Sequence, residues 1–98
     1  MRWIWDAEKN RTNRRDHRVS FETAQLVFDD PLAITLPDPF REEERWRTIG
    51  SPSVHPAVVL LVVHTWPEAD EADEEIGRII SARKATSHER RAYEEGTF

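Results

Sequence analysis

The stretch RIISARKATSHERRAYEEG, residues 78–96, begins with the pattern of a buried strand and ends with the pattern of a helix. Thr86 and Glu89 have the T-x-x-E spacing in which each side chain caps the other residue's backbone N–H. Gly96 stands where a helix often ends, because glycine readily adopts the left-handed conformation found there. The stretch therefore predicts a strand over residues 75–83 and a helix from Thr86 to Gly96.

Four further strands are expected upstream of this pair. Residues 57–66 (AVVLLVVHTW) are apolar up to His64, which is typical of a central strand covered on both faces. Shorter strands are predicted over residues 2–5, 32–36 and 44–51 from alternating or β-branched patterns bounded by turn residues.

Two helices are predicted between the first and second strands. Asp6 suits an N-cap for a polar helix that ends near His17, and Ser20 suits an N-cap for a helix over residues 21–28. In the second helix, apolar residues recur at helical spacing and should face the core: Phe21, Ala24, Val27 and Phe28. The predicted order is β-α-α-β-β-β-β-α, an α+β fold in which an antiparallel sheet packs against helices, with residues 1–98 forming one domain.

Composition narrows the classes of protein that remain. The chain has no cysteine, its longest apolar run is far below the ~20 residues of a membrane span, and its first residues lack the apolar core of a signal peptide. A cytoplasmic protein without membrane contact is expected. The net charge is −5, but residues 68–75 (EADEADEE) carry six negative charges, so the rest of the chain stands at +1. This segment is expected to be a solvated loop, with arginine clusters elsewhere.

Neither a metal site nor a cofactor is expected. The four histidines, His17, His55, His64 and His88, stand apart, and no pair has the spacing of a zinc-binding helix. With three glycines in the chain, no glycine-rich phosphate loop is present either.

Two segments carry a resemblance to a known family. WDAEKNRTNRRDHRVSF (residues 5–21) and RIISARKAT (residues 78–86) resemble the BrnT family of bacterial type II toxins, and the similarity extends from Trp5 to Gly96. The resemblance implies a fold like that of the RelE toxins, metal-independent cleavage of RNA, and a cognate antitoxin, BrnA, through which DNA is contacted only indirectly. Two features depart from the family: Asp16-His17-Arg18 replaces the usual Lys-His-Gly, and residues 68–75 are unusually long and acidic.

The joint between the last strand and the last helix is a candidate catalytic site. Cleaving RNA through its own 2′-hydroxyl requires a group to accept that proton, cations to stabilise the charge on the phosphate, and a proton donor for the leaving oxygen. Arg83 can hold two phosphate oxygens with its planar fork, and Lys84 can act as a point charge. Alternatively, Arg83 pairs with a carboxylate and Lys84 faces solvent.

The first predicted helix carries a polar row. Lys9, Asn13 and His17 are spaced i, i+4 and i+8, so they share one face. Lys9 and His17 are candidates for proton transfer and Asn13 for RNA contact, with a solvated helix face as the alternative.

Further candidates lie on the strands and the last helix. His64 and Trp66 should point to the same side, for proton transfer and base stacking respectively, although a lone histidine at a strand end is more often structural. Arg45 and Arg47 should share one strand face and contact RNA.

Arg78 and Tyr93 complete the candidate catalytic set. Arg78 and Arg83 are five residues apart and would lie on opposite faces of a straight strand. A twist or bulge must bring them together, or only one of them belongs to the site. Tyr93 either sends its hydroxyl back toward the start of the last helix or packs in the core.

Two functions remain open at this point. One is an endoribonuclease toxin that is neutralised by a BrnA-like antitoxin. The other is a catalytically weak or inactive protein of the same fold that joins an antitoxin in a transcriptional repressor complex.

Overall fold

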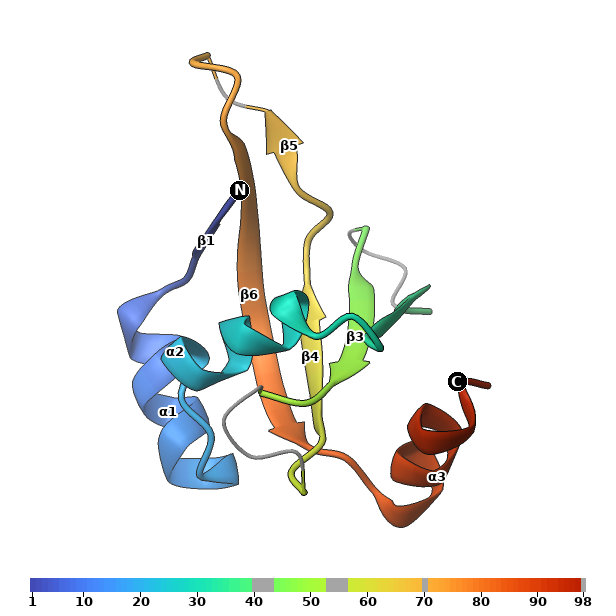
Figure 1. Cartoon of the computed structure of the whole chain (residues 1–98). Helices are drawn as coiled ribbons and strands as arrows, with labels where there is room; N and C mark the ends of the chain where they lie inside the picture. The colour runs from blue at the N-terminus through green and yellow to red at the C-terminus, as the bar shows by residue number, and fades with distance from the viewer. Residues whose placement is uncertain (40–43, 53–56, 70, 98) are drawn as a thin grey trace.

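A computed structural model describes residues 1–39, 44–52, 57–69 and 71–97 of the chain (Figure 1). A six-stranded sheet carries helices on both of its faces, which confirms the α+β class. The elements in order are β1 (Arg2–Ile4), α1 (Ala7–His17), α2 (Phe21–Ala24), the 3-10 helix η1 (Gln25–Asp29), β2 (Ile34–Pro37), β3 (Trp46–Gly50), β4 (Leu60–His64), β5 (Glu68–Ala69), β6 (Glu75–Lys84) and α3 (Ser87–Glu95). None of the helices in these ranges is long and apolar enough to cross a membrane.

The sheet has the strand order β1-β6-β4-β3-β2. Strands β2, β3, β4 and β6 pair with their neighbours in antiparallel fashion, as predicted. The first strand, β1, lies parallel to β6 at the edge of the sheet. The last strand, β6, therefore lies between the first strand, β1, and strand β4.

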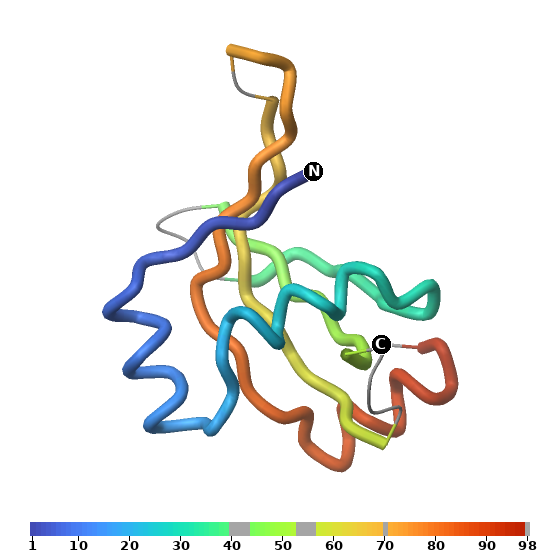
Figure 2. Tube along the Cα trace, turned by 60° about the vertical axis from the view of Figure 1, so that its left-hand side comes forward, coloured from blue at the N-terminus to red at the C-terminus, as the bar shows by residue number. Residues whose placement is uncertain are grey.

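The predicted element order was wrong in the acidic segment, which contains an additional strand. Glu68 and Ala69 form β5 and pair with Ile76 and Glu75 of β6, so the segment is the end of a β-hairpin instead of a loop. The hairpin projects beyond the rest of the sheet in both views (Figures 1 and 2). Backbone pairing holds its base, while the carboxylates of its described residues are exposed to water: Glu68, Glu71, Asp73, Glu74 and Glu75.

The predicted helix boundaries follow local capping. Asp6 and Ser20 accept hydrogen bonds from the backbone N–H groups three residues ahead, and Thr86 and Glu89 form the complete capping box. Gly96 ends α3 with φ of 71°. The second helix is shorter than predicted: the α-helical turn α2 passes into the 3-10 helix η1.

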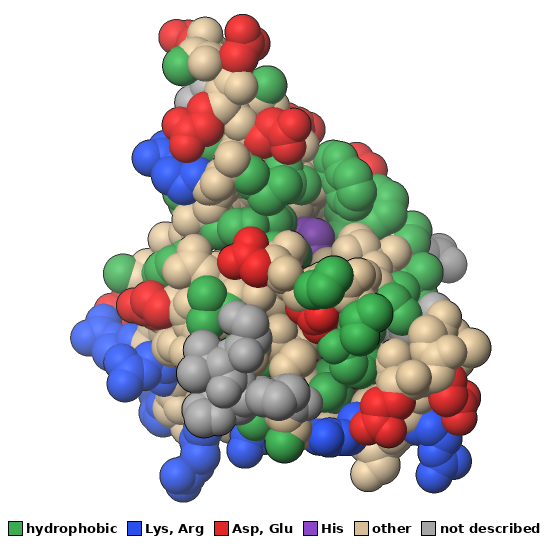
Figure 3. Space-filling model, in the orientation of Figure 1, with side chains coloured by type: hydrophobic (Ala, Val, Ile, Leu, Met, Phe, Trp, Pro, Cys, Tyr) green, Lys and Arg blue, Asp and Glu red, His purple; other side chains and the backbone are tan. Residues whose placement is uncertain are grey.

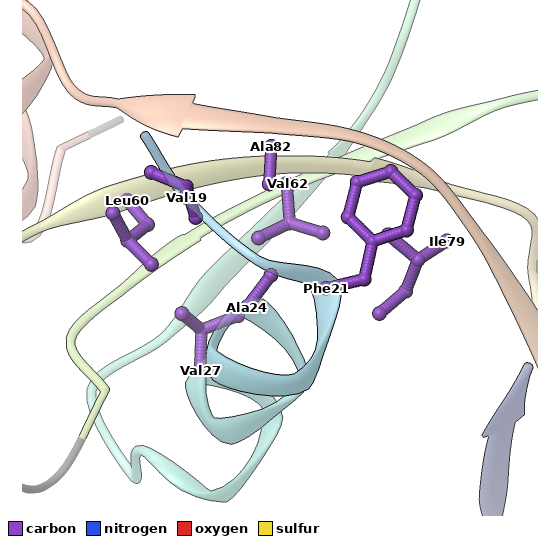
Figure 4. Close-up of a cluster of buried hydrophobic side chains, with 8 residues drawn as sticks. All are labelled: Val19, Phe21, Ala24, Val27, Leu60, Val62, Ile79 and Ala82. Carbon is purple, nitrogen blue, oxygen red and sulfur yellow. The ribbon is translucent and has the colours of Figure 1, made fainter. Parts of the chain in front are cut away.

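Buried hydrophobic side chains form one cluster on each face of the sheet. The larger cluster (Figure 4) joins the segment before and along α2 and η1 to β4 and β6: Val19, Phe21, Ala24, Val27, Leu60, Val62, Ile79 and Ala82. The smaller cluster joins Ile49, Val59 and Leu61, with Ala85 and Tyr93 packed against it. We call the first side of the sheet the helical face and the second side the α3 face.

A β-bulge in β6 changes which of its residues share a face. Val63 lies opposite Ser81 but His64 lies opposite Ile79, so β6 has one extra residue at this point. Ile79 and Ala82 consequently both lie in the helical-face cluster, although they are three residues apart. Their outer neighbours, Arg78 and Arg83, therefore both point to the α3 face.

Gly77 is required by the packing of Trp3 across β6. The Trp3 ring stacks on Phe28 with centroids 3.8 Å apart, and a Cβ at Gly77 would overlap the Trp3 ring. We expect Gly77→Ala to lower the free energy of unfolding by about 1–3 kcal/mol, as overpacking in a core usually does. Urea denaturation of the variant would measure this loss.

The double variant Gly77→Ala, Trp3→Leu tests the cause of that loss. Removing the ring should relieve the overlap, so the double variant should lose less stability than the sum of the two single losses. Simple additivity would show that Gly77 matters for another reason.

Candidate functional site

Three arginines lie around Ser81 on the α3 face of the sheet. Arg47 on β3, Val63 on β4 and Ser81 on β6 lie directly opposite one another in the strand pairing. Arg83 flanks this row on one side, and the bulge brings Arg78 to the same face on the other side. All five side chains are half-buried. We call the group of Arg47, Arg78 and Arg83 around Ser81 the arginine face.

Arg83 is held in place by Glu89 of α3. Its Nη1 and Nη2 atoms donate to the two carboxylate oxygens at 2.7 and 3.0 Å, and Nη1 also donates to the Lys84 carbonyl at 3.3 Å. These hydrogen bonds from Arg83 lower the pKa of Glu89 to about 2. Arg83 therefore pairs with a carboxylate, as the alternative interpretation of the sequence expected. Even so, 38% of the surface of the Arg83 side chain is exposed. The pair fixes the guanidinium on the arginine face.

Lys84 and Arg83 lie on opposite faces of the sheet, so the geometry does not support the expected two-residue phosphate clamp. Lys84 lies opposite Leu60, whereas Arg83 lies opposite Leu61, and neighbouring residues of a strand point to opposite faces. Lys84 instead lines a cavity of about 500 Å³ together with Arg14 and Arg18, from the end of α1. Strand β6 runs through Lys84, one residue further than predicted, and α3 begins after its N-cap Thr86, as predicted.

Asn13 has a structural role, and its geometry does not support the expected contact with RNA. It is 7% exposed, donates to the carbonyls of Val19 and Ala82 at 2.9 and 2.7 Å, and accepts from the N–H of Ala82 at 3.2 Å. Strand β1 pairs with β6 only along residues 76–78, so Asn13 supplies backbone partners further along the same edge. Its amide is occupied by these bonds.

The predicted polar row of α1 does exist on either side of Asn13. Lys9 and His17 are exposed and line one hollow of about 380 Å³, together with Asp16 and the bulge residue Ile80. Asp16 accepts a hydrogen bond from Arg15 at 2.9 Å, and this bond lowers the pKa of Asp16. The hollow lies at the edge of β6, next in sequence to Ser81 of the arginine face.

His64 does not lie with the arginines, so its position does not support the expected catalytic role. It is 2% exposed on the helical face, where its ring contacts the edges of Trp3 and Phe28. Burial lowers the pKa of His64 and outweighs its hydrogen bond to the Thr65 carbonyl. That carbonyl, 2.8 Å away, can only accept, so Nδ1 carries the proton and Nε2 accepts from the Thr48 hydroxyl at 2.6 Å. The ring is a neutral part of the core.

Trp66 points to the same side as His64, as predicted, because both line one cavity. Its side chain is exposed and lies beside Trp46, with ring centroids 4.7 Å apart. Trp66 therefore lies on the helical face, whereas Ser81 and the arginine face lie on the α3 face.

Tyr93 anchors α3, and its geometry does not support the expected catalytic role. Its hydroxyl donates to Asp30 at 2.5 Å, away from the start of the helix, and burial together with Asp30 raises the pKa of Tyr93 to about 12. Burial works to raise the pKa of Asp30, but hydrogen bonds from Tyr93, Ser51 and Leu32 outweigh it and lower that pKa. The ring packs against the smaller hydrophobic cluster.

The remaining candidate, Arg45, directly precedes β3 and is half-buried. Its carbonyl accepts from the N–H of Asp38 at 2.9 Å. His55 and the arginine at position 41 lie outside the described residues. Sequence reasoning missed the group of Arg14, Arg18 and Lys84, for which the i, i+4 spacing of the two arginines was a signal.

Comparison with known proteins identifies the family. The family model described as "Ribonuclease toxin, BrnT, of type II toxin-antitoxin system" matches residues 5–89. The 1.1 Å crystal structure of the Brucella abortus ribonuclease toxin BrnT has a similar fold, with a TM-score of 0.58 and 21% sequence identity over 89% of this chain and 99% of that one. A search of curated proteins found no match. The chain thus belongs to the BrnT family of ribonuclease toxins of type II toxin–antitoxin systems.

Proposed function

We propose that this protein is an endoribonuclease toxin that cleaves RNA with its own side chains, without a metal ion, and so arrests growth. The observation that carries the proposal is the arginine face, where the strand pairing puts Arg47, Arg78 and Arg83 on the same side of the sheet as Ser81. Such groups stabilise the negative charge that develops on a phosphate during transfer.

In the proposed reaction, the 2′-oxygen of the RNA attacks the adjacent phosphorus and the bond from phosphorus to the 5′-oxygen breaks. A base takes the proton of the 2′-hydroxyl, and an acid returns a proton to the leaving 5′-oxygen. Lys9 and His17 are the proposed proton-transfer pair, because both are exposed and line one hollow at the edge of β6. The products are a 2′,3′-cyclic phosphate and a 5′-hydroxyl.

The partner is a protein antitoxin, as membership in a type II family implies. We propose a BrnA-like antitoxin that covers the arginine face in the cytoplasm, with DNA contacted through the antitoxin alone. Carboxylates on such a partner would speed association through complementary charge.

A second candidate function rests on the Arg83–Glu89 pair. A guanidinium whose charge is already compensated stabilises a phosphate less well, so the protein can instead be a weak enzyme that serves in a repressor complex.

Expression of the chain alone in bacteria distinguishes the two functions. The toxin should stop growth, and the purified protein should cut RNA in the presence of a chelator to leave 2′,3′-cyclic phosphate ends. Normal growth with soluble, intact protein would favour the second function, and cleavage that the chelator abolishes would contradict the metal-independent mechanism.

A further inference from the structure

A cavity of about 590 Å³ lies on the helical face of the sheet, where the arginine face does not reach. Six of its lining residues are apolar or aromatic: Met1, Trp3, Leu26, Phe28, Trp66 and Pro67. Figure 3 shows hydrophobic side chains around a hollow on this side of the molecule, with acidic side chains on the hairpin above it. We call this hollow the aromatic cavity. Its volume lies in the usual range for binding pockets, about 300–1,000 Å³.

The rim of the aromatic cavity exposes large apolar groups to water. Met1 is 72% exposed and Trp66 is 53% exposed, and both line the cavity. Trp46 supports the Trp66 ring from one side, so the indole is held in position although it is not covered. Grouped apolar exposure of this kind marks a binding surface more often than a lone exposed side chain does.

Several polar groups in the cavity accept hydrogen bonds, whereas Arg2 and Gln25 can donate them. Because His64 Nε2 accepts from Thr48, the Thr48 oxygen must itself accept from the Thr35 hydroxyl, 2.7 Å away. This chain leaves the lone pairs of Thr35 facing the cavity. Asp29 and Glu75 add two exposed carboxylates, while the cation Arg2 pairs with Glu74 at 3.7 Å.

The charge around the cavity selects the class of partner. Glu68 lies on the hairpin near Glu75, and Glu44 and Glu68 line a second hollow with Trp66, so carboxylates gather around the Trp66 ring. Positive charge at the cavity comes from Arg2, which pairs with Glu74, and from the amino group of Met1. Grouped carboxylates repel the phosphates of RNA and attract cations. Other cations lie on the arginine face and around Lys84.

We propose that the aromatic cavity docks a cationic, apolar-flanked segment of a partner protein, with an arginine side chain against Trp66. A guanidinium stacks on an indole face and still offers hydrogen bonds in its plane, here to Thr35, Asp29 and Glu75. The flanking apolar side chains cover Met1 and Leu26. This surface is additional to the proposed cleavage site.

Short synthetic peptides test the proposal with the full chain. A peptide with one arginine among leucines should bind, with a change in tryptophan fluorescence, and should weaken as salt is raised. The same peptide with citrulline in place of arginine should bind about tenfold more weakly, since it keeps the shape but loses the charge. Equal binding of the two peptides would overturn the proposal.

Matched variants locate the binding site. Trp66→Ala and Glu75→Gln should each weaken binding of the arginine peptide about tenfold, and Trp66→Phe should restore most of it. Leu32→Ala and Glu95→Gln change an exposed leucine and an exposed glutamate outside the cavity, so they should leave affinity unchanged.

Two outcomes would refute this assignment. If Trp66→Ala binds the peptide as the natural protein does, the cavity is not the docking site. If Trp66→Ala instead weakens binding of a single-stranded RNA oligonucleotide and the peptide does not compete with that RNA, the cavity serves RNA. Because the peptide assay contains no cleavage step, its failure leaves the proposed ribonuclease activity untouched, and loss of that activity leaves this result untouched.

Discussion

Replacing Arg83 by alanine should lower the rate of RNA cleavage about 100-fold or more, whereas replacing Lys84 by alanine should lower it less than about tenfold. Removing one preorganised donor from a developing negative charge commonly costs a factor of about 10²–10³. Arg83 lies on the arginine face, and its neighbour Lys84 lies on the other side of the sheet. Single-turnover cleavage of an RNA oligonucleotide would measure both rates.

The control for Arg83→Ala concerns its partner. Glu89 is 14% exposed and would be left with an uncompensated charge, which can unfold the protein and mimic a loss of catalysis. The double variant Arg83→Ala, Glu89→Gln removes that charge and should fold, yet should cleave RNA as slowly as the single variant. If Lys84→Ala proves to be the inactive variant, the site is the cavity of Arg14, Arg18 and Lys84.

Asn13→Ala should lower the free energy of unfolding by about 2–4 kcal/mol, because it leaves buried backbone groups without partners. The side chain satisfies both backbone groups of Ala82 and the carbonyl of Val19. A loss of this size is a large fraction of the about 5–15 kcal/mol that stabilises a typical domain. The midpoint of urea denaturation would show it.

Two further variants separate hydrogen bonding from shape at this position. Asn13→Asp keeps the size but cannot donate to the two carbonyls, so it should be at least as destabilising as Asn13→Ala near neutral pH. Thr12→Ala, on the exposed side of α1, should change stability by less than about 0.5 kcal/mol. A loss of similarly small size for Asn13→Ala would mean that water replaces the amide.

The elements that could be predicted are those whose signals lie close together in the chain. The N-caps at Asp6 and Ser20, the capping box of Thr86 and the final Gly96 each depend on atoms within about one helical turn. The antiparallel order of β2, β3, β4 and β6 also followed, because consecutive strands usually pair.

The predicted roles that the geometry does not support belong to residues whose surroundings come from distant parts of the chain. Asn13 looked like part of a solvated row, but α1 packs it against the open edge of β6. The hydroxyl of Tyr93 donates a hydrogen bond to Asp30, which lies far away in the chain, and does not point to the start of its own helix. His64 ends a strand, as predicted, but Trp3 and Phe28 from other elements enclose it.

The sequence by itself determined the family, the α+β class and the ends of the helices, since motifs, periodicity and capping are local properties of the chain. Only the tertiary structure decided which side chains share a surface. One extra residue in β6, set by its pairing with β4, moves Arg78 onto the face of Arg83, and plain strand alternation sends Lys84 away from it. Side chains alternate along a strand, so a shift of one residue reverses every face beyond it, and that shift arises from pairing between segments far apart in the chain.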